Sequence, residues 1–192
     1  MRVNYRNTDE IQHCAYEFAK DILTPASADD DGVPLIKPEM AGRHGPTPEV
    51  VRVASLKAEA SYIVDQFKSL HARGTPWNQM AVLYMARFMA EELAGTLASS
   101  NIPFEWMKDR SSKRFNSFGD SVKVMTLHSS KGLEFPIVAI IGLGSMPHMN
   151  GDAADDARLL YVGMTRATEQ LLMTASRDSV FVRKLSAFKK AA

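Results

Sequence analysis

The sequence predicts an α/β fold with a mostly parallel sheet flanked by helices, and two observations support this prediction. Short runs rich in β-branched and other apolar residues alternate along the chain with longer segments whose apolar residues recur at helical spacing. One short run, residues 136–141, is apolar at almost every position, which is typical of a strand buried on both faces of a parallel sheet. Such alternation favours parallel strands whose connecting helices cover the sheet.

The expected helices are defined by apolar periodicity and by residues that favour helix ends. Thr8 suits the cap of the first helix, acidic residues 9–10 suit its first turn, and the helix is expected to end near Pro25. A second helix is expected over 56–72, and Gly74 suits its end. Later helices are expected around 89–98, with an end before Asn101, and over 152–167 and 179–188.

The expected strands are short and lie between these helices. They cover residues 2–6, 50–55, 80–84, 104–106, 122–126, 136–141 and 171–175. Residues 26–48 are rich in Asp, Gly and Pro and show no apolar period, so we expect a mobile loop there. A basic segment is found at 107–115, and the whole chain, 1–192, is expected to form one domain.

The composition is that of an ordinary soluble globular protein, with 45% apolar and 23% charged residues. A net charge of +1 neither requires nor excludes nucleic acid, so any basic binding surface must be local. The single cysteine, Cys14, excludes an intrachain disulfide, and the eleven methionines suggest core packing rather than a metal site. No apolar run is long enough to span a bilayer and the polar N-terminus lacks a signal peptide, so we expect a cytoplasmic protein with no membrane contact.

A polar turn between two expected strands is the most informative stretch of the chain. Residues 126–135 read T-L-H-S-S-K-G-L-E-F, and the small hydroxyl residues with a backbone-exposing glycine suit a loop that contacts phosphate. Taken alone, His128 would more often be a structural histidine. Lys131 is equally consistent with a phosphate contact and with a solvated side chain.

Two further segments carry arginines that suit phosphate chemistry. Residues 155–167 read D-D-A-R-L-L-Y-V-G-M-T-R-A, and residues 4–7 read N-Y-R-N. A guanidinium is planar and always charged, so Arg166 is suited to stabilise charge that develops on a transferring phosphoryl group. Taken alone, however, Arg166 would be a solvated helix residue, and residues 4–7 would contain a buried tyrosine beside a surface arginine.

In chain order, residues 4–7, 126–135 and 155–167 closely resemble motifs IV, V and VI, respectively, of the UvrD/Rep-like superfamily 1 DNA helicases. Aspartates 155–156 stand where glutamate is usual, and Ala157 stands where a second arginine is common. Residues 80–84 and 101–104 resemble a further segment of the family, with Met85 in place of a common arginine. The resemblance covers almost the whole chain except 26–48, and it implies a RecA-like fold of the P-loop NTPase type.

The resemblance implies a role for each matched residue. Arg166 corresponds to an arginine finger and Arg6 to a γ-phosphate contact, which makes them the candidate catalytic residues, while Tyr5 would stack on adenine and Glu134 would bind the ribose of ATP. The residues implied at the DNA backbone are Thr126, His128, Ser129 and Lys131. Because ligands gather at one end of the strands in open parallel sheets, we expect the four ATP-site residues to converge at one solvent-open end of the sheet, with Arg166 on the helix over 152–167.

Two motifs of a complete motor are missing from the sequence. There is no G-x-x-x-x-G-K-[ST] phosphate loop (Walker A) and no apolar strand that ends in an acidic Mg²⁺-binding D-E-x-Q sequence (Walker B). The D-E-I-Q at residues 9–12 falls at the start of an expected helix. The chain is therefore expected to be the C-terminal motor domain of an ATP-dependent DNA helicase, with 3′–5′ polarity by resemblance, and to be inactive in isolation. Its expected partners are single-stranded DNA and an N-terminal RecA-like domain, with ATP and Mg²⁺ bound only in the full-length protein. Residues 105–121 are too few to hold the accessory domain found at this point in many relatives.

One alternative remains open at this stage. The chain could be a non-catalytic module, derived from such a helicase, that binds nucleic acid or a partner, and the missing phosphate loop allows either interpretation. The retained set of ATP-site residues favours the motor, because a non-catalytic module has no need of groups that sense a γ-phosphate. A complete small nucleotide-binding enzyme is disfavoured, because nothing in the sequence could cradle a triphosphate alone.

Overall fold

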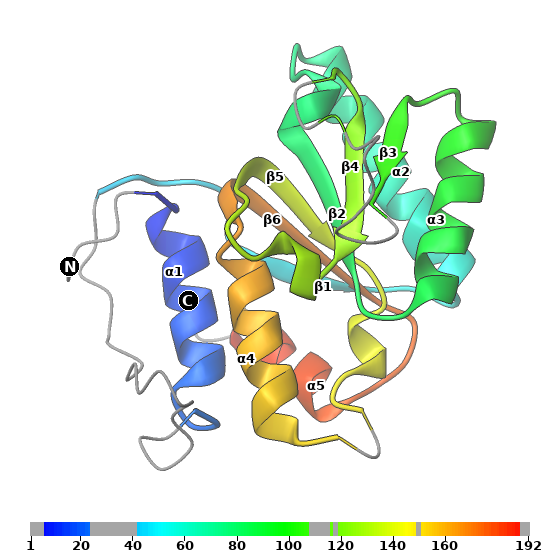
Figure 1. Ribbon diagram of the computed structural model, residues 1–192. Helices are drawn as coiled ribbons and strands as arrows, with labels where there is room; N and C mark the ends of the chain where they lie inside the picture. The colour runs from blue at the N-terminus through cyan, green and yellow to red at the C-terminus, as the bar shows by residue number, and fades with distance from the viewer. Residues whose placement is uncertain (1–5, 24–41, 108–115, 117–118, 149–150, 189–192) are drawn as a thin grey trace.

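A parallel sheet organises the chain (Figure 1). In the computed structural model, residues 6–23, 42–107, 116, 119–148 and 151–188 are described, and within them six strands pair in the order β1-β6-β5-β2-β4-β3, every neighbouring pair being parallel. The strands are β1 Glu49–Arg52, β2 Met80–Tyr84, β3 Phe104–Trp106, β4 Val122–Thr126, β5 Phe135–Ile140 and β6 Ala167–Ala175. The helices are α1 Asp9–Ala19, α2 Leu56–Ala72, α3 Arg87–Ser99, α4 Ala153–Met164 and α5 Val180–Phe188.

Helices cover the sheet on both faces (Figure 1). Helices α1, α4 and α5 pack on one face around a core that includes Ile11, Leu160 and Phe181, and α2 and α3 pack on the other around Phe67 and Leu93. The central strand β2 is buried at every position, as its apolar sequence predicts for a strand covered on both faces. The predicted α/β fold with a parallel sheet flanked by helices is confirmed.

Local sequence explains where several helices begin. The Ser55 side chain accepts a hydrogen bond from the backbone N–H of Ala58 at the start of α2, and Asp152 does the same for Ala154 at the start of α4. Helix α2 ends before Gly74, whose φ of +100° is readily adopted only by glycine.

No helix in the described part of the chain is long and apolar enough to cross a membrane.

The structure corrects two predicted helix ends. Helix α1 ends at Ala19 rather than near Pro25. Helix α4 ends at Met164 rather than at Ala167, so Arg166 lies in the turn that joins α4 to β6 and not on the helix. The turn closes because the Thr165 hydroxyl and Arg166 Nε both donate to the carbonyl of Val162, at 2.9 and 3.0 Å. Strand β6 then begins four residues earlier than predicted, where Ala167 pairs with Phe135.

The predicted polar turn, with no helix, between the strands over 122–126 and 136–141 is confirmed between β4 and β5. Residues 127–134, which we call the β4–β5 connection, contain one turn of 3-10 helix, His128–Ser130, and no α-helix. Because β4 and β5 are both parallel to β2, this connection runs from the carboxyl end of the sheet, where strands end, to the amino end, where they begin. It crosses the face covered by α4, since Leu127 belongs to the core on that side.

Three predicted segments lie wholly or partly outside the described residues. The first strand was predicted over 2–6, of which only Arg6 is described, in a bend. The basic segment 107–115 is described only at Met107. The predicted mobile loop, 26–48, is described from residue 42, and these last residues contact α1 through hydrogen bonds: Gly42 N–H and Gly45 N–H donate to the carboxylates of Asp9 and Glu10, respectively.

Candidate functional site

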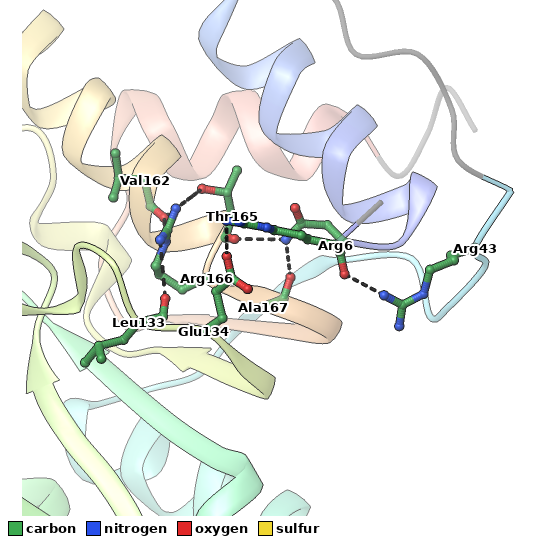
Figure 2. Close-up of polar contacts among 9 residues, drawn as sticks. Arg6, Arg43, Leu133, Glu134, Val162, Thr165, Arg166 and Ala167 are labelled. Carbon is green, nitrogen blue, oxygen red and sulfur yellow. Dashed lines mark hydrogen bonds and ion pairs between the residues drawn. The ribbon is translucent and has the colours of Figure 1, made fainter. Parts of the chain in front are cut away.

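Three of the predicted ATP-site residues lie together at the amino end of the sheet (Figure 2). Glu134 directly precedes β5 and Arg166 directly precedes β6, and the Phe135 N–H donates to the Arg166 carbonyl at 3.0 Å, which places the two strand starts side by side. The Nη1 atom of Arg6 lies 2.7 Å from Oε1 of Glu134. The fourth residue, Tyr5, lies outside the described residues.

Arg166 is held in place by backbone carbonyls (Figure 2). Besides the bond to Val162, its Nη1 donates to the carbonyl of Leu133 at 3.3 Å. Burial lowers the pKa of Arg166, the carboxylate of Glu134 raises it, and the charge of Arg6 lowers it, but a guanidinium remains protonated under all ordinary conditions. The turn therefore fixes a half-buried positive charge whose orientation is set before any ligand arrives.

A carboxylate, that of Glu134, accompanies the two arginines. Glu134 forms an ion pair with Arg6 and also attracts Arg166 electrostatically, so its carboxylate offsets the repulsion between the two cations. The Arg6 side chain is 73% exposed, so this end of the sheet is open to solvent at Arg6. A cluster of two guanidinium groups and one carboxylate can bind an anionic group and accept a hydroxyl hydrogen bond.

Two residues that sequence reasoning did not single out hold this cluster together. Asn7 is 2% exposed, and its Nδ2 donates to the carbonyls of Thr165, at 2.9 Å, and Ala167, at 2.6 Å. From the other side, Arg43 Nη1 donates to the carbonyl of Arg6 at 2.7 Å (Figure 2). Asn7 could have been noticed because it belongs to residues 4–7, whereas Arg43 lies in a stretch without a pattern.

The predicted DNA-contacting residues lie at the opposite, carboxyl end of the sheet. Thr126 ends β4, and its hydroxyl donates to Ser129 Oγ at 2.9 Å while accepting from the Ser129 N–H at 3.0 Å. His128 and Lys131 are exposed on the same turn, and Gly132 follows with a φ of +88°. The Thr126 and Ser129 side chains thus shape the turn that presents His128 and Lys131.

The two ends are joined by the β4–β5 connection, which contacts α4 near its start and the turn between α4 and β6 near its end. Near its start, Leu127 lies so close to Gly163 of α4 that a Cβ atom at position 163 would overlap the leucine Cδ2. Near its end, the Leu133 carbonyl accepts from Arg166. A single short segment therefore links the candidate DNA contacts to the arginine cluster.

Comparison with known families decides what kind of domain this is. The family model described as the UvrD-like helicase C-terminal domain matches residues 1–112 and 106–178. The chain belongs to the UvrD-like helicase C-terminal domain family. The suspected resemblance is therefore confirmed, and the matched region includes both the arginine cluster and the turn after β4.

Relatives of this UvrD-like domain include named helicases. The ATP-dependent DNA helicase Rep of Escherichia coli is 45% identical over 65 residues, which cover 31% of this chain and 10% of that protein. A probable DNA helicase of Mycoplasma pneumoniae is 28% identical over 195 residues, which cover 96% of this chain and 32% of that protein. Even where almost the whole UvrD-like domain is matched, it spans about a third of the length of the curated relative.

A solved structure shares the fold of this UvrD-like domain. It is the C-terminal domain of a possible DNA helicase from Lactobacillus plantarum WCFS1, with a TM-score of 0.66 and 21% identity, and the match covers 95% of this chain and 94% of that one. At this identity the likeness shows the fold alone. It agrees with the predicted RecA-like α/β arrangement.

The cluster in this UvrD-like domain combines cationic donors, from Arg6 and Arg166, with a carboxylate acceptor from Glu134. In the part of the chain that is described, no group of three or more His, Cys, Asp or Glu side chains could hold a metal ion.

Proposed function

We propose that this UvrD-like domain is the C-terminal motor domain of an ATP-dependent DNA helicase that translocates 3′ to 5′ along single-stranded DNA. The observation that carries the proposal is the cluster of Arg6, Glu134 and Arg166 at the amino end of the sheet. Pairing of β5 with β6 already places Glu134 beside Arg166, whereas Arg6 comes from a separate segment of the chain. An ion pair as exposed as Arg6–Glu134 adds little stability, so the fold does not depend on that contact. The names of the relatives, which include ATP-dependent DNA helicases, support the same function.

In this proposal, the domain completes an ATP site whose larger part is supplied by an N-terminal RecA-like domain. ATP with Mg²⁺ would supply the phosphoryl group that is transferred to water. Arg166 stabilises the negative charge that develops on that group, since its guanidinium is already oriented by the carbonyls of Val162 and Leu133. Arg6 contacts the terminal phosphate, Glu134 accepts a hydrogen bond from the ribose, and Tyr5 stacks on the base.

At the carboxyl end of the sheet, the turn after β4 contacts the DNA backbone in this proposal. Because the Thr126 hydroxyl donates to Ser129 Oγ, the proton of the Ser129 hydroxyl is directed elsewhere and can be donated to a phosphate. His128 and Lys131 are exposed beside it and add donors and positive charge. Contacts of this kind bind single strands without reading bases and weaken as salt rises.

The first test uses the isolated chain. Without a phosphate loop or Mg²⁺ carboxylates it should release no phosphate from ATP above the buffer background, even with single-stranded DNA present. Turnover that survives repurification and disappears in an Arg166→Ala variant would show that the chain is a complete ATPase and would overturn the proposal.

The second test uses the full-length helicase that carries this domain. Arg166→Ala should lower DNA-stimulated kcat by about a thousandfold or more while changing the KM for ATP far less, because the contact strengthens as charge develops in the transition state. Arg166→Lys should recover little of this loss, because an ammonium lacks the planar fork. Arg73→Ala, at the exposed end of α2, is the matched control and should leave kcat unchanged. Normal turnover of Arg166→Ala would favour the non-catalytic module instead.

A further inference from the structure

Asn7 connects the two arginines through the backbone on either side of Arg166. Its side-chain amide donates both of its hydrogens to carbonyls, one to Thr165 at 2.9 Å and one to Ala167 at 2.6 Å. Both acceptors are carbonyl oxygens, so only the nitrogen of the Asn7 amide can face them. Asn7 is also the residue directly after Arg6, so the segment that carries one arginine is bonded to the turn that carries the other.

The geometry of these bonds constrains Arg166 more tightly than a single contact would. The Asn7 bond to the Thr165 carbonyl fixes the peptide plane before the Arg166 Cα atom, and the bond from the Phe135 N–H to the Arg166 carbonyl fixes the plane after it. The Asn7 bond to the Ala167 carbonyl fixes the next peptide along the chain. The direction in which the side chain leaves the backbone is thereby set. Because the site is 2% exposed at Asn7, water does not compete for these carbonyls.

The Arg6 segment is held from its other side by residues 42–45. Arg43 Nη1 donates to the Arg6 carbonyl at 2.7 Å, and the Arg43 carbonyl accepts from the N–H of Asp9 at 2.8 Å. The carboxylate of Glu10 receives the N–H of Gly45 at 2.9 Å and lies 3.0 Å from His44 Nδ1. Two contacts therefore hold the backbone that follows the Arg6 Cα atom, one from Arg43 to the Arg6 carbonyl and one from Asn7 to the turn that carries Arg166.

We propose that Asn7 is a positioning residue that sets the location of Arg166 relative to Arg6, and that it acts on turnover through Arg166. This inference rests on the proposed function, since it assumes that Arg166 acts on a phosphoryl group. Asn7 itself touches no substrate. Its two donors keep the arginine turn in register with Arg6, so that both guanidinium groups meet the same phosphate.

The test compares Asn7→Asp, Arg166→Ala and the double variant in the full-length helicase that carries this domain. Aspartate has the same size as asparagine but presents oxygen atoms to both carbonyls, so the two hydrogen bonds are lost and replaced by repulsion. Asn7→Asp should lower kcat by about tenfold to a hundredfold, the scale expected for a misplaced catalytic group, with a KM for ATP within about threefold of the unchanged enzyme. In the Arg166→Ala background, the same substitution should lower kcat by less than about threefold further.

Thr8→Val is the matched control. Thr8 is the next residue, is 3% exposed, and its hydroxyl has no hydrogen-bond partner among the described residues, so the substitution alters the same buried segment without breaking a hydrogen bond there. It should leave kcat unchanged. Thermal unfolding of all variants establishes that each is folded at the assay temperature, and if Asn7→Asp is not, Asn7→Ala takes its place in the same cycle, since it removes both donors without adding repulsion.

The outcomes separate this inference from the proposed function. If Arg166→Ala lowers kcat and Asn7→Asp does not, Asn7 has no positioning role and the inference fails alone. Losses that multiply in the double variant would overturn it as well, because Asn7 would then act independently of Arg166. If Arg166→Ala itself turns over normally, the proposed function fails first.

Discussion

Gly163 of α4 lies directly against Leu127, the first residue after β4, with no space between them for a side chain at position 163. The contact occurs where the β4–β5 connection leaves the carboxyl end of the sheet and passes under α4. Leu127 is 1% exposed and belongs to the core shared by α1, α4 and α5. The absence of a side chain at Gly163 therefore determines how closely this connection can approach the helix that leads to Arg166.

Gly163→Ala should destabilise the domain although alanine favours helices. Its Cβ would overlap Leu127 Cδ2, and forcing extra volume into a packed core typically costs about 1–3 kcal/mol. Gly95→Ala on α3 is the matched control, because a Cβ there meets nothing within 4 Å and should stabilise by about 0.5–1 kcal/mol. Urea unfolding of both variants measures the difference. A Gly163→Ala domain as stable as Gly95→Ala would show that the contact relaxes freely.

Valine substitutions at two buried threonines should change the stability of the domain in opposite directions. The Thr8 hydroxyl is buried without a partner, so Thr8→Val removes an unsatisfied polar group and should stabilise by about 1 kcal/mol. The Thr174 hydroxyl donates to Glu59 Oε2 at 2.7 Å, so Thr174→Val deprives a fully buried carboxylate of a donor and should destabilise by about 1.5–3 kcal/mol. Chemical unfolding midpoints test the pair, and shifts of the same sign would contradict the assignment.

The stability and the reactivity of the buried Cys14 thiol on α1 should depend on the folding of the domain. Burial raises the pKa of Cys14 to about 12, whereas the pKa of the thiol in the unfolded chain is about 8.5. Between these two pH values the folded domain keeps the thiol proton and the unfolded chain releases it. The stability from this difference is fully present below that unfolded value. It is lost as the pH rises toward 12, by up to about 1.4 kcal/mol per pH unit.

Two measurements check this prediction for Cys14. A maleimide should label the native domain at neutral pH only at the rate of unfolding, and rapid labelling would show that the thiol is accessible. Between about pH 9 and pH 11, the Cys14→Ala variant should lose less stability with rising pH than the unchanged domain. Identical slopes for the two proteins would mean that the thiol does not contribute.

The sequence predicts most of the fold because local patterns and burial agree along much of the chain. The apolar run of β2 and the amphipathic helix α2 both fall at their predicted bounds, since neither needs a distant contact to define it. The end of α4 is different. It is set by the pairing of Ala167 with Phe135, a contact between residues far apart in sequence, which extends β6 back toward the helix.

The candidate site was foreseen in its residues but not in its location or its supports. Of the four residues that motif resemblance grouped, the three that are described, Arg6, Glu134 and Arg166, lie together. No pattern indicated that they lie at the amino end of the sheet, opposite Thr126. That arrangement depends on the β4–β5 connection crossing a whole face without a helix, whereas strands joined in parallel usually have one between them. The contact from Arg43 could not be predicted, because residues 42–48 show no period.

Removal of the carboxylate between the two arginines should turn this cluster into a stronger anion site. Glu134 now neutralises part of the charge of Arg6 and Arg166, and the Arg6–Glu134 pair, with side chains 73% and 34% exposed, contributes less than about 1 kcal/mol to stability. Glu134→Gln keeps the size of the side chain and removes a negative charge from beside the two guanidinium groups. The melting temperature of the variant in sodium chloride should therefore differ little from that of the unchanged domain. Phosphate at several times its Kd should stabilise the variant by about 1 kcal/mol, because it binds the folded state. The unchanged domain should be stabilised less by the same phosphate concentration. Thermal unfolding in phosphate and in chloride at matched ionic strength measures this.

Glu169→Gln is the control, because the Glu169 carboxylate lies 4.0 Å from Arg43 and outside the pair of arginines, so the response of this variant to phosphate should equal that of the unchanged domain. If phosphate stabilises Glu134→Gln no more than Glu169→Gln, the two arginines do not act on a common anion.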